Sequence, residues 1–299
     1  MRPIFTYPTA LLAGLALLGS SRADAQQFSK RKQYNSVGFS LNAMNYFGDL
    51  APKTSFPSFR FNNTRPNVGV TLTRRFYPRV SGRLSLSYGR ITGDDATAAN
   101  ASDANARYRY NRNANFQNDI QELAAVVIVD LIQNRNNYLK RPDFVPYVFA
   151  GVAGFHHNPQ GRRADGTYVD LQPLATEGKA YSRFQFSLPF GGGVRYRINR
   201  NFDASLELGI RKTFTGYLDD VNGKYLGPEA FGIDPKKLPA TYTDQQYFGY
   251  GITKSHSGDF TNFDIKDSKR GQDKTDWYVV TGLSLNYILT PRIKNPKFR

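Results

Sequence analysis

Few residues in this chain have the types and spacing that chemistry requires. Gly191-Gly192-Gly193 could cradle a phosphate, but no Gly-Lys-Ser/Thr sequence completes a phosphate loop and no helix is predicted to follow. Glycines that relieve curvature within a strand are the better interpretation. His156-His157 could offer two imidazoles to a metal, yet adjacent residues of a strand point to opposite faces, which disfavours joint ligation.

Carboxylates on predicted external loops are a second candidate. Glu177, Asp219 and Asp220 could bind a divalent cation, or could bridge loops through Arg183 and Lys212. Solvated loop carboxylates are the commoner case. The sequence therefore predicts no metal site and no cofactor at these residues.

A lipid-modifying enzyme would need a nucleophile and a base, such as serine with histidine, at the outer rim of the protein. The three histidines, His156, His157 and His256, all fall on or near predicted external loops. None of them has a serine at an informative spacing. We therefore expect no catalytic residues and a protein that is not an enzyme.

The element that would position such residues is a predicted hairpin over Ser182–Phe214. Both arms alternate strictly, and Asn199-Arg200-Asn201 forms the turn. Alternation with a period of two indicates strands with one apolar and one polar face. A soluble sheet would suit the pattern too. However, each arm exceeds the roughly 5–6 residues of a usual soluble strand and reaches the ~9–11 residues that cross a bilayer.

Six further segments alternate in the same way and give eight predicted strands in all. The other six are Ser36–Tyr46, Pro66–Tyr77, Ser81–Ile91, Asn118–Ile132, Val145–Phe155 and Asp276–Leu289. Asn118–Ile132 is nearly continuously apolar, but its β-branched run and the shared parity of Glu122 and Asp130 favour a strand over a buried helix.

Loop lengths predict how these strands are connected. The connections after strands two, four and six are short or moderate. The other four are long: Phe47–Arg65, Thr92–Gln117, His156–Tyr181 and Thr215–Thr275. This pattern is typical of outer-membrane barrels. The predicted fold class is all-β: an eight-stranded antiparallel transmembrane β-barrel with short periplasmic turns and long extracellular loops.

Charged residues on the polar faces of these strands would point into the lumen. Eight strands leave room only for side chains, so no open pore is expected. The charges could neutralise one another there, since unpaired they would cost several kcal/mol each, on the order of the effective burial penalty. The predicted lumen charge network is Arg75, Arg83, Glu122, Asp130, Arg195, Asp203, Glu207 and Arg211.

The N-terminus and composition indicate export. Residues 1–25 have a basic start, an apolar run from Ala10 to Leu18 and an Ala23-Asp24-Ala25 cleavage site, which predict a signal peptide. The barrel would occupy residues 26–290 and a basic tail residues 291–299. The chain has no cysteine, which excludes disulfides and thiolate metal sites.

The formal net charge of +16 becomes +15 when two arginines and one aspartate leave with residues 1–25. In an exported protein this excess favours phosphorylated lipid head groups, including those of lipopolysaccharide, anionic glycans or an acidic protein over nucleic acid.

Several longer motifs in collinear order resemble one known family. They are NYFGDL (residues 45–50), YGRITGDD (88–95), NDIQEL (118–123), PYVFAG (146–151), LQPLATEG (171–178) and RKTFTGYLDDV (211–221). Together they resemble the PorG-like outer-membrane β-barrel family of the Bacteroidota. The long fourth loop and the basic tail depart from the family pattern.

The resemblance implies a non-enzymatic component of the type IX secretion system in the cell outer membrane. PorG-like barrels are associated with a periplasmic ring of PorK and PorN, so proteins resembling these two are the expected partners, bound through the short turns. The family supplies no catalytic residues. The alternative is a surface adhesin or glycan-binding barrel that uses its long loops.

Overall fold

The computed structural model describes residues 32–50, 63–98, 107–234, 241–250 and 269–290. The predicted signal peptide (1–25), the basic tail (291–299) and His256 lie outside the described residues. In the described ranges no helix has the length and apolar character needed to span a membrane.

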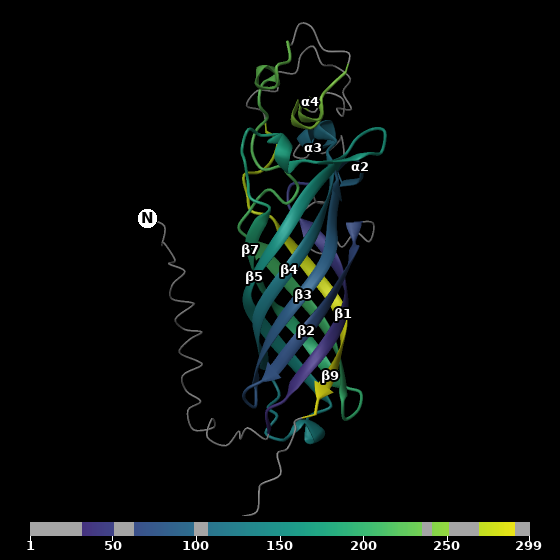
Figure 1. The fold of residues 1–299 in the computed structure, drawn as a ribbon, viewed down its shortest axis with the longest axis vertical. Coiled ribbons are helices and arrows are strands. Elements are labelled where there is room, and N and C mark those ends of the chain that lie inside the picture. The colour runs from purple at the N-terminus through teal and green to yellow at the C-terminus, as the bar shows by residue number, and fades with distance from the viewer. Residues whose placement is uncertain (1–31, 51–62, 99–106, 235–240, 251–268, 291–299) are drawn as a thin grey trace, which may run out of the picture.

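Eight long antiparallel strands close into a barrel (Figure 1). The strands are β1 (Asn35–Phe47), β2 (Arg65–Arg75), β3 (Val80–Asp94), β4 (Asn115–Asp130), β5 (Phe144–Arg162), β7 (Phe184–Arg197), β8 (Phe202–Thr213) and β9 (Trp277–Leu289). Each pairs with its neighbours along the chain, and pairing of β1 with β9, for example Val37 with Tyr287, closes the sheet. The short strand β6 (Tyr168–Asp170) pairs with the end of β5 outside this ring. The predicted fold of an eight-stranded antiparallel barrel is confirmed.

Alternation along each strand separates an apolar exterior from a mostly polar lumen. Phe39, Leu41, Phe186 and Leu283 are each more than half exposed on the outside. Such a band of large exposed side chains is what a membrane-spanning barrel presents to lipid. The intervening residues face inward because successive side chains of a strand point to opposite faces.

The glycine run of β7 marks a close approach between strands. A Cβ atom at Gly191 would lie 2.1 Å from the carbonyl oxygen of Leu208 on β8, so no side chain fits there. This agrees with the interpretation of the run as a device for curvature rather than a phosphate loop.

Several strands extend further than the sequence predicted. β5 continues from Phe155 to Arg162, and β3 and β4 pair as far as Asp94 with Asn115. His156-His157 therefore lies within a strand and not in a loop. The apolar alternation stops where the strands leave the lipid-facing band, but backbone pairing does not need apolar side chains and continues.

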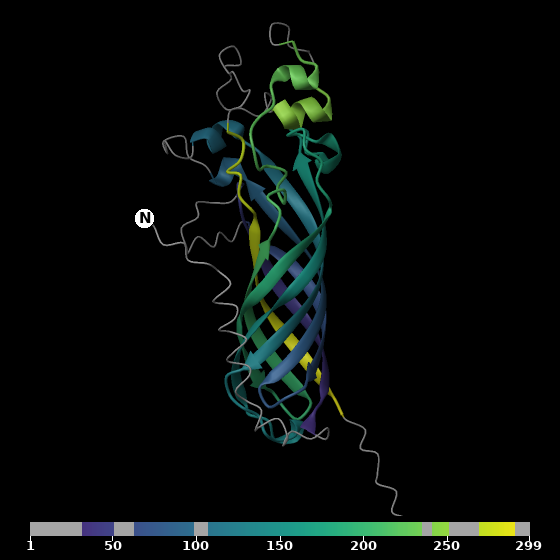
Figure 2. The same cartoon turned by 90° about the vertical axis from the view of Figure 1, so that its left-hand side faces the viewer.

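The two ends of the barrel are built differently (Figure 2). The long connections form one end and carry α2 (Asp95–Ala98), α3 (Arg107–Arg112), η6 (Gln172–Leu174), η7 (Pro228–Phe231) and α4 (Asp244–Tyr250). We call the described residues of the long connections, 48–50, 95–98, 107–114, 163–183, 214–234, 241–250 and 269–276, the cap. The described residues of the connection predicted over Thr92–Gln117 thus include two short helices, α2 and α3.

The three short connections lie at the opposite end, where β1 starts and β9 stops (Figure 1). They comprise residues 76–79, 131–143 and 198–201, and the second contains η5 (Tyr138–Lys140). We call these three connections the platform.

Candidate functional site in the lumen, the cap and the platform

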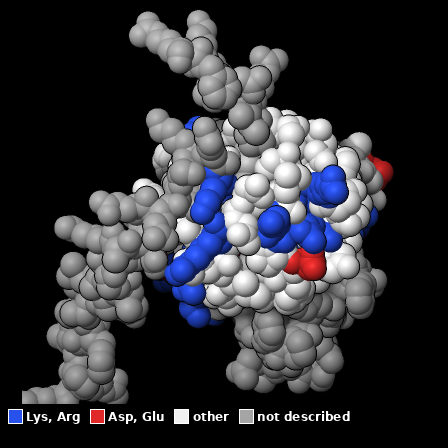
Figure 3. All heavy atoms as spheres, turned by 90° about the horizontal axis from the view of Figure 1, so that it is seen from below, with Lys and Arg blue, Asp and Glu red and all other residues white. Residues whose placement is uncertain are grey.

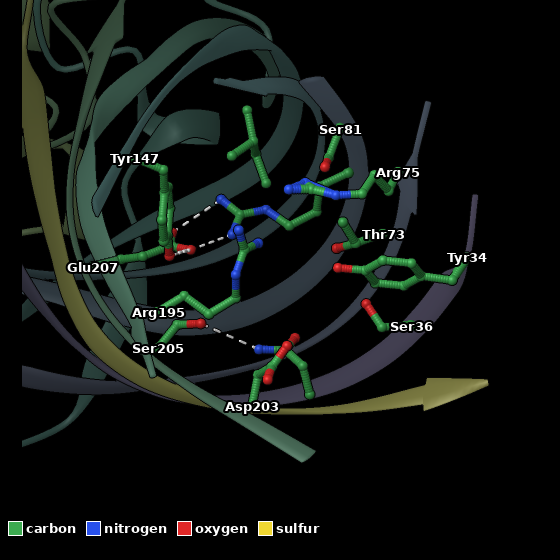
Figure 4. A pocket seen from close by; sticks show the side chains of 13 residues that line it. Tyr34, Ser36, Thr73, Arg75, Ser81, Tyr147, Arg195, Asp203, Ser205 and Glu207 are labelled. Atoms are coloured by element: carbon green, nitrogen blue, oxygen red, sulfur yellow. Dashed lines mark hydrogen bonds and ion pairs between the residues drawn. The ribbon is translucent and has the colours of Figure 1, made fainter. Parts of the chain in front are cut away.

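The eight charged residues predicted for the lumen all lie inside the barrel in ion pairs, most of which join strands across it. Figure 4 shows the part of this network around Arg75, Arg195 and Glu207. Asp130 on β4 pairs with Arg75 from β2 and, at 2.6 Å, with Arg195 from β7. On the opposite walls β3 and β8, Arg83 and Glu207 form a bidentate pair. These contacts tie together strands that are not neighbours in the sheet.

The remaining predicted residues have partners that sequence reasoning missed. Glu122 lies 3.4 Å from Arg211 and also accepts a 2.6 Å hydrogen bond from the hydroxyl of Tyr278. Asp203 pairs at 2.7 Å with Arg141, a residue of the platform. The inward orientation of Tyr278 could have been predicted, because Tyr278 has the same parity along its strand as Gly282, Ser284 and Asn286.

Tyr147 completes the network by donating a 2.6 Å hydrogen bond to Glu207. It packs with Val126, Ile128 and Phe149 in an apolar layer inside the lumen. The barrel is therefore filled by paired charges and packed side chains, apart from small cavities between them. This arrangement braces opposite walls and suits a rigid scaffold.

In the cap, two buried arginines join the long connections to one another. The guanidinium of Arg270 donates to Thr176 (2.7 Å), to the carboxylate of Glu177 (3.0 Å) and to the carbonyl of Asp220 (3.0 Å). Arg112 donates to Asp95 at 2.6 and 2.9 Å and to the carbonyl of Arg270 at 2.5 Å. Arg112 also donates to the carbonyl of Asp49 at 3.0 Å, so contacts of the two arginines join all four long connections.

This geometry corrects the expectation that Glu177, Asp219 and Asp220 are solvated or bridge to Arg183 and Lys212. All three carboxylates are buried. Glu177 and Asp220 pair with Arg270 instead, because the long fourth connection folds back over the barrel mouth. Within the described part of the chain, no group of three or more His, Asp and Glu side chains has the arrangement of a metal site.

Two buried carboxyl groups of the cap share one hydroxyl. The hydroxyl oxygen of Tyr46 lies 2.7 Å from Asp219 Oδ2 and 2.9 Å from Asp276 Oδ1. A hydroxyl has one proton to donate, so one of the two carboxyl groups must supply a second proton for both contacts to be hydrogen bonds.

The pKa values agree with a proton held here. Burial, together with the nearby carboxylate of Asp49, raises the pKa of Asp219 to about 8. Burial and the charge of Asp219 raise the pKa of Asp276 as well. Asp219 Oδ2 also accepts from the Leu50 amide at 3.1 Å, whereas Asp276 Oδ1 faces Tyr46, so the proton is best placed on Asp276 Oδ1.

Neither of the two described histidines is arranged as a catalytic base. His157 is fully buried, stacks on Tyr181 and has its Nε2 atom 3.3 Å from the carbonyl oxygen of Ser182, not from a serine hydroxyl. His156 points to the opposite, exposed side of β5. Their separation follows from the alternation of side chains along a strand.

In the platform, Arg141 joins two of the three connections. It donates to the carbonyls of Tyr138 (2.6 Å), Arg200 (2.8 Å) and Asn199 (2.8 Å), besides its pair with Asp203. The remaining connection, residues 76–79, is joined by backbone hydrogen bonds, since the Asn134 amide donates to the carbonyl of Pro78 and the Asp130 amide to that of Arg79. The platform is thus a single hydrogen-bonded unit. Sequence reasoning missed Arg141 because it lies in a turn with no periodic pattern.

Comparisons with known proteins give one family match and several structural likenesses. A family described as "Domain of unknown function (DUF6089)" matches residues 24–232. A search of curated proteins found no match to the chain.

Among solved structures, the chain is similar to the attachment invasion locus protein Ail of Yersinia pestis, in complex with the heparin analogue sucrose octasulfate. The TM-score is 0.38 and the identity 7%, over 86% of this chain and 99% of Ail. The Neisserial surface protein NspA has a TM-score of 0.38 and 10% identity over 85% of this chain and 96% of NspA. The outer-membrane protein OprG of Pseudomonas aeruginosa has a TM-score of 0.38 and 10% identity over 89% and 99%.

Proposed function

The chain belongs to the DUF6089 family, and from this premise we propose that it is a non-enzymatic outer-membrane barrel that anchors a periplasmic ring complex of the type IX secretion system. The platform would face the periplasm and the cap the cell exterior. The expected partners are ring proteins resembling PorK and PorN, together with outer-membrane lipid including lipopolysaccharide.

The observation that carries the proposal is the rigidity of a barrel whose interior is filled. Ion pairs cross the lumen, and Arg141 together with backbone hydrogen bonds holds the platform as one unit. A solute channel would need an open interior, and an enzyme would need an accessible nucleophile with its base. A braced membrane protein with a fixed end surface suits attachment, because a pre-organised surface loses little entropy when a partner binds.

Two further observations support the proposal. The motif order in residues 45–221 resembles PorG-like barrels, which are associated with such a ring. The exposed apolar band on all eight strands, with Trp277 and Phe47 stacked at its cap end, suits a bilayer with an interfacial aromatic belt.

Deletion of the gene tests the secretion function. We expect cargo of the type IX route to disappear from the culture supernatant and to accumulate in the periplasm, with export restored by complementation. In parallel, the tagged barrel should recover ring proteins at near-stoichiometric yield from detergent-solubilised outer membranes. An unrelated eight-stranded barrel with the same tag serves as the control.

Normal export together with failure to recover ring proteins would contradict the anchor. The structured cap would then be the functional end, and the protein a surface adhesin or glycan-binding barrel. Trimming the connection Thr92–Gln117, whose described residues include α2 and α3, would in that case abolish ligand binding while export continues.

A further inference from the structure

Basic side chains are exposed on each of the three connections of the platform. Arg79, Lys140 and Arg200 come from the first, second and third connection respectively, and all three are exposed. Figure 3, which views the barrel from this end, shows Lys and Arg side chains spread over the end surface with little acidic colour between them.

The charge of this surface has one sign. Asp143 is the one exposed carboxylate among the described residues of the platform, and its side chain pairs with Arg197 at 2.5 Å. Asp130 and Asp203, at the strand ends beside the platform, are buried and paired. The sequence next to the barrel at this end is basic too, with Lys30-Arg31-Lys32 before β1 and four Lys or Arg residues in 291–299.

The backbone that carries these side chains is held in place. The carbonyl of Arg79 accepts a hydrogen bond of 2.8 Å from Asp130, and the carbonyl of Arg200 accepts one of 2.8 Å from Arg141. Asn137 caps η5 by accepting from the amide of Lys140 at 3.3 Å. The backbone positions from which the three basic side chains extend are therefore set before any partner arrives, which lowers the entropic cost of binding.

We propose that the platform is the docking surface of the anchor and that it binds an acidic face of a periplasmic protein. This inference rests on the proposed function and adds to it the location of the contact and the charge of the partner. A fixed array of positive charges gains the most binding free energy from a matching array of negative charges on a folded partner. Such complementary charges also speed the encounter of the two proteins.

Anionic lipid is a less suitable occupant for these residues. Lys140 and Arg200 belong to connections beyond the ends of the strands. A basic residue placed for lipid head groups is Arg74, which is exposed on the outer surface of β2 with its guanidinium over the Phe76 ring at 5.5 Å. The two kinds of basic residue can be separated by substitution.

The test compares two charge-reversed barrels that carry the same number of new charges. The platform variant is Arg79→Glu, Lys140→Glu and Arg200→Glu. The matched control changes exposed lysines of the cap end: Lys179→Glu, Lys212→Glu and Lys224→Glu. Full-length proteins in detergent are measured against immobilised ring proteins of the PorK and PorN type, and against vesicles of phosphatidylethanolamine with phosphatidylglycerol.

We expect the platform variant to associate with the ring proteins about 10–100-fold more slowly at low salt, and the control to match the unmodified barrel. The difference should shrink at about 0.5 M salt, because salt screens interactions between exposed charges. Binding to the anionic vesicles should change little.

Equal association of the platform variant and the unmodified barrel would overturn the docking surface while leaving the anchor intact. A loss restricted to the anionic vesicles would overturn it in favour of lipid. Failure of the unmodified barrel to bind ring proteins would instead contradict the proposed function itself. If the triple variant does not fold, as judged by heat-dependent gel mobility, the milder Lys140→Gln and Arg200→Gln pair provides the same comparison.

Discussion

The cap and the platform are each held together by buried arginine that hydrogen-bonds to backbone carbonyls of other connections. The two ends differ in charge, because the cap has an excess of carboxyl groups and the platform an excess of basic groups. In the cap, Arg112 and Arg270 are surrounded by Glu177, Asp219, Asp220 and other carboxyl groups, and a proton is held between two of these. In the platform, Arg141 neutralises Asp203 and leaves basic side chains exposed.

This difference indicates what each end can do. A buried excess of carboxyl groups makes the stability of the cap dependent on protonation. An exposed excess of ammonium and guanidinium groups costs little stability and is available to a partner. The same kind of brace therefore closes the cap at one end and, at the other, holds the basic surface proposed for docking.

The largest expected effect is at Arg270. Arg270→Met would leave Glu177 and Asp220 buried without their cation, and breaking a buried pair in this way costs about 3–5 kcal/mol. The amides of Asn222 and Gly223, which donate to Glu177 at 3.0 Å, should lose protection from hydrogen exchange. Protection of strand amides in the barrel should persist.

The exposed Lys179→Met is the matched control for loss of a cation in the cap. Unchanged protection of Asn222 in the Arg270→Met protein would show that the cap is held by its apolar clusters alone. That result would contradict the view that a buried arginine holds the cap together.

A smaller loss is expected at the other brace. Arg141→Met removes hydrogen bonds from a charged donor to two connections and unpairs Asp203. The expected cost is about 2–3 kcal/mol, smaller than at Arg270 because one buried carboxylate rather than two loses its cation. Increased protease cleavage within residues 131–143, with the cap unchanged, is the expected result.

Arg141→Lys separates charge from geometry at this site. A lysine keeps the positive charge beside Asp203 but cannot reproduce the fork that reaches several carbonyls at once. We expect cleavage between that of the unmodified protein and Arg141→Met. Full protection in the lysine variant would mean that charge alone holds the platform together.

The barrel could be predicted from the sequence because the same alternating pattern repeats in every strand. Each strand must alternate over the width of a bilayer, so eight independent segments carry the same pattern. The inward charges were found by the same parity, and so could Tyr278 have been. The strand ends were missed because residues such as Asn158 in β5 pair outside the lipid band, where no alternation is required.

The braces of the two ends could not be predicted in this way. Arg270 contacts residues 93 and 94 positions away in the sequence, and Tyr46 contacts Asp276 from 230 positions away. Residues in irregular connections carry no period that would reveal which of them are buried. Their contacts depend on how four long connections fold over one another, which is a property of the assembled barrel.

The proton in the cap predicts a pH dependence of moderate size. The Asp219 pKa of about 8 lies above the value of 3.8 expected in an unfolded chain, and Asp219 titrates as one pair with Asp276 through Tyr46. The contribution of this pair to stability is thus fully present below pH 3.8, declines as the pH rises and is lost by about pH 8. We expect the cap to loosen progressively over this range, which the fluorescence of Trp277, the single tryptophan, can follow beside Asp276.

Two amide variants test where that proton lies. In Asp276→Asn, the new amide nitrogen can donate to the Tyr46 hydroxyl oxygen while the remaining oxygen accepts from the Leu218 amide, so the cap should stay closed and lose its pH response. In Asp219→Asn, the nitrogen must face the amide of Leu50 or of Val221, and the cap should loosen at every pH. The reverse outcome would place the proton on Asp219.

The smallest effect on stability is expected at Asp143. Its side chain is 69% exposed, so Asp143→Asn should change the free energy of unfolding by less than about 0.5 kcal/mol. The platform nevertheless becomes more positive, and association with acidic ring proteins at low salt should become faster, by less than about tenfold for a single rim charge. Replacing the cap carboxylate Asp165, also exposed, by Asn should leave that rate unchanged. A slower rate in Asp143→Asn would mean that the Arg197–Asp143 pair orients the platform, and that recognition there depends on the arrangement of the charges more than on their sum.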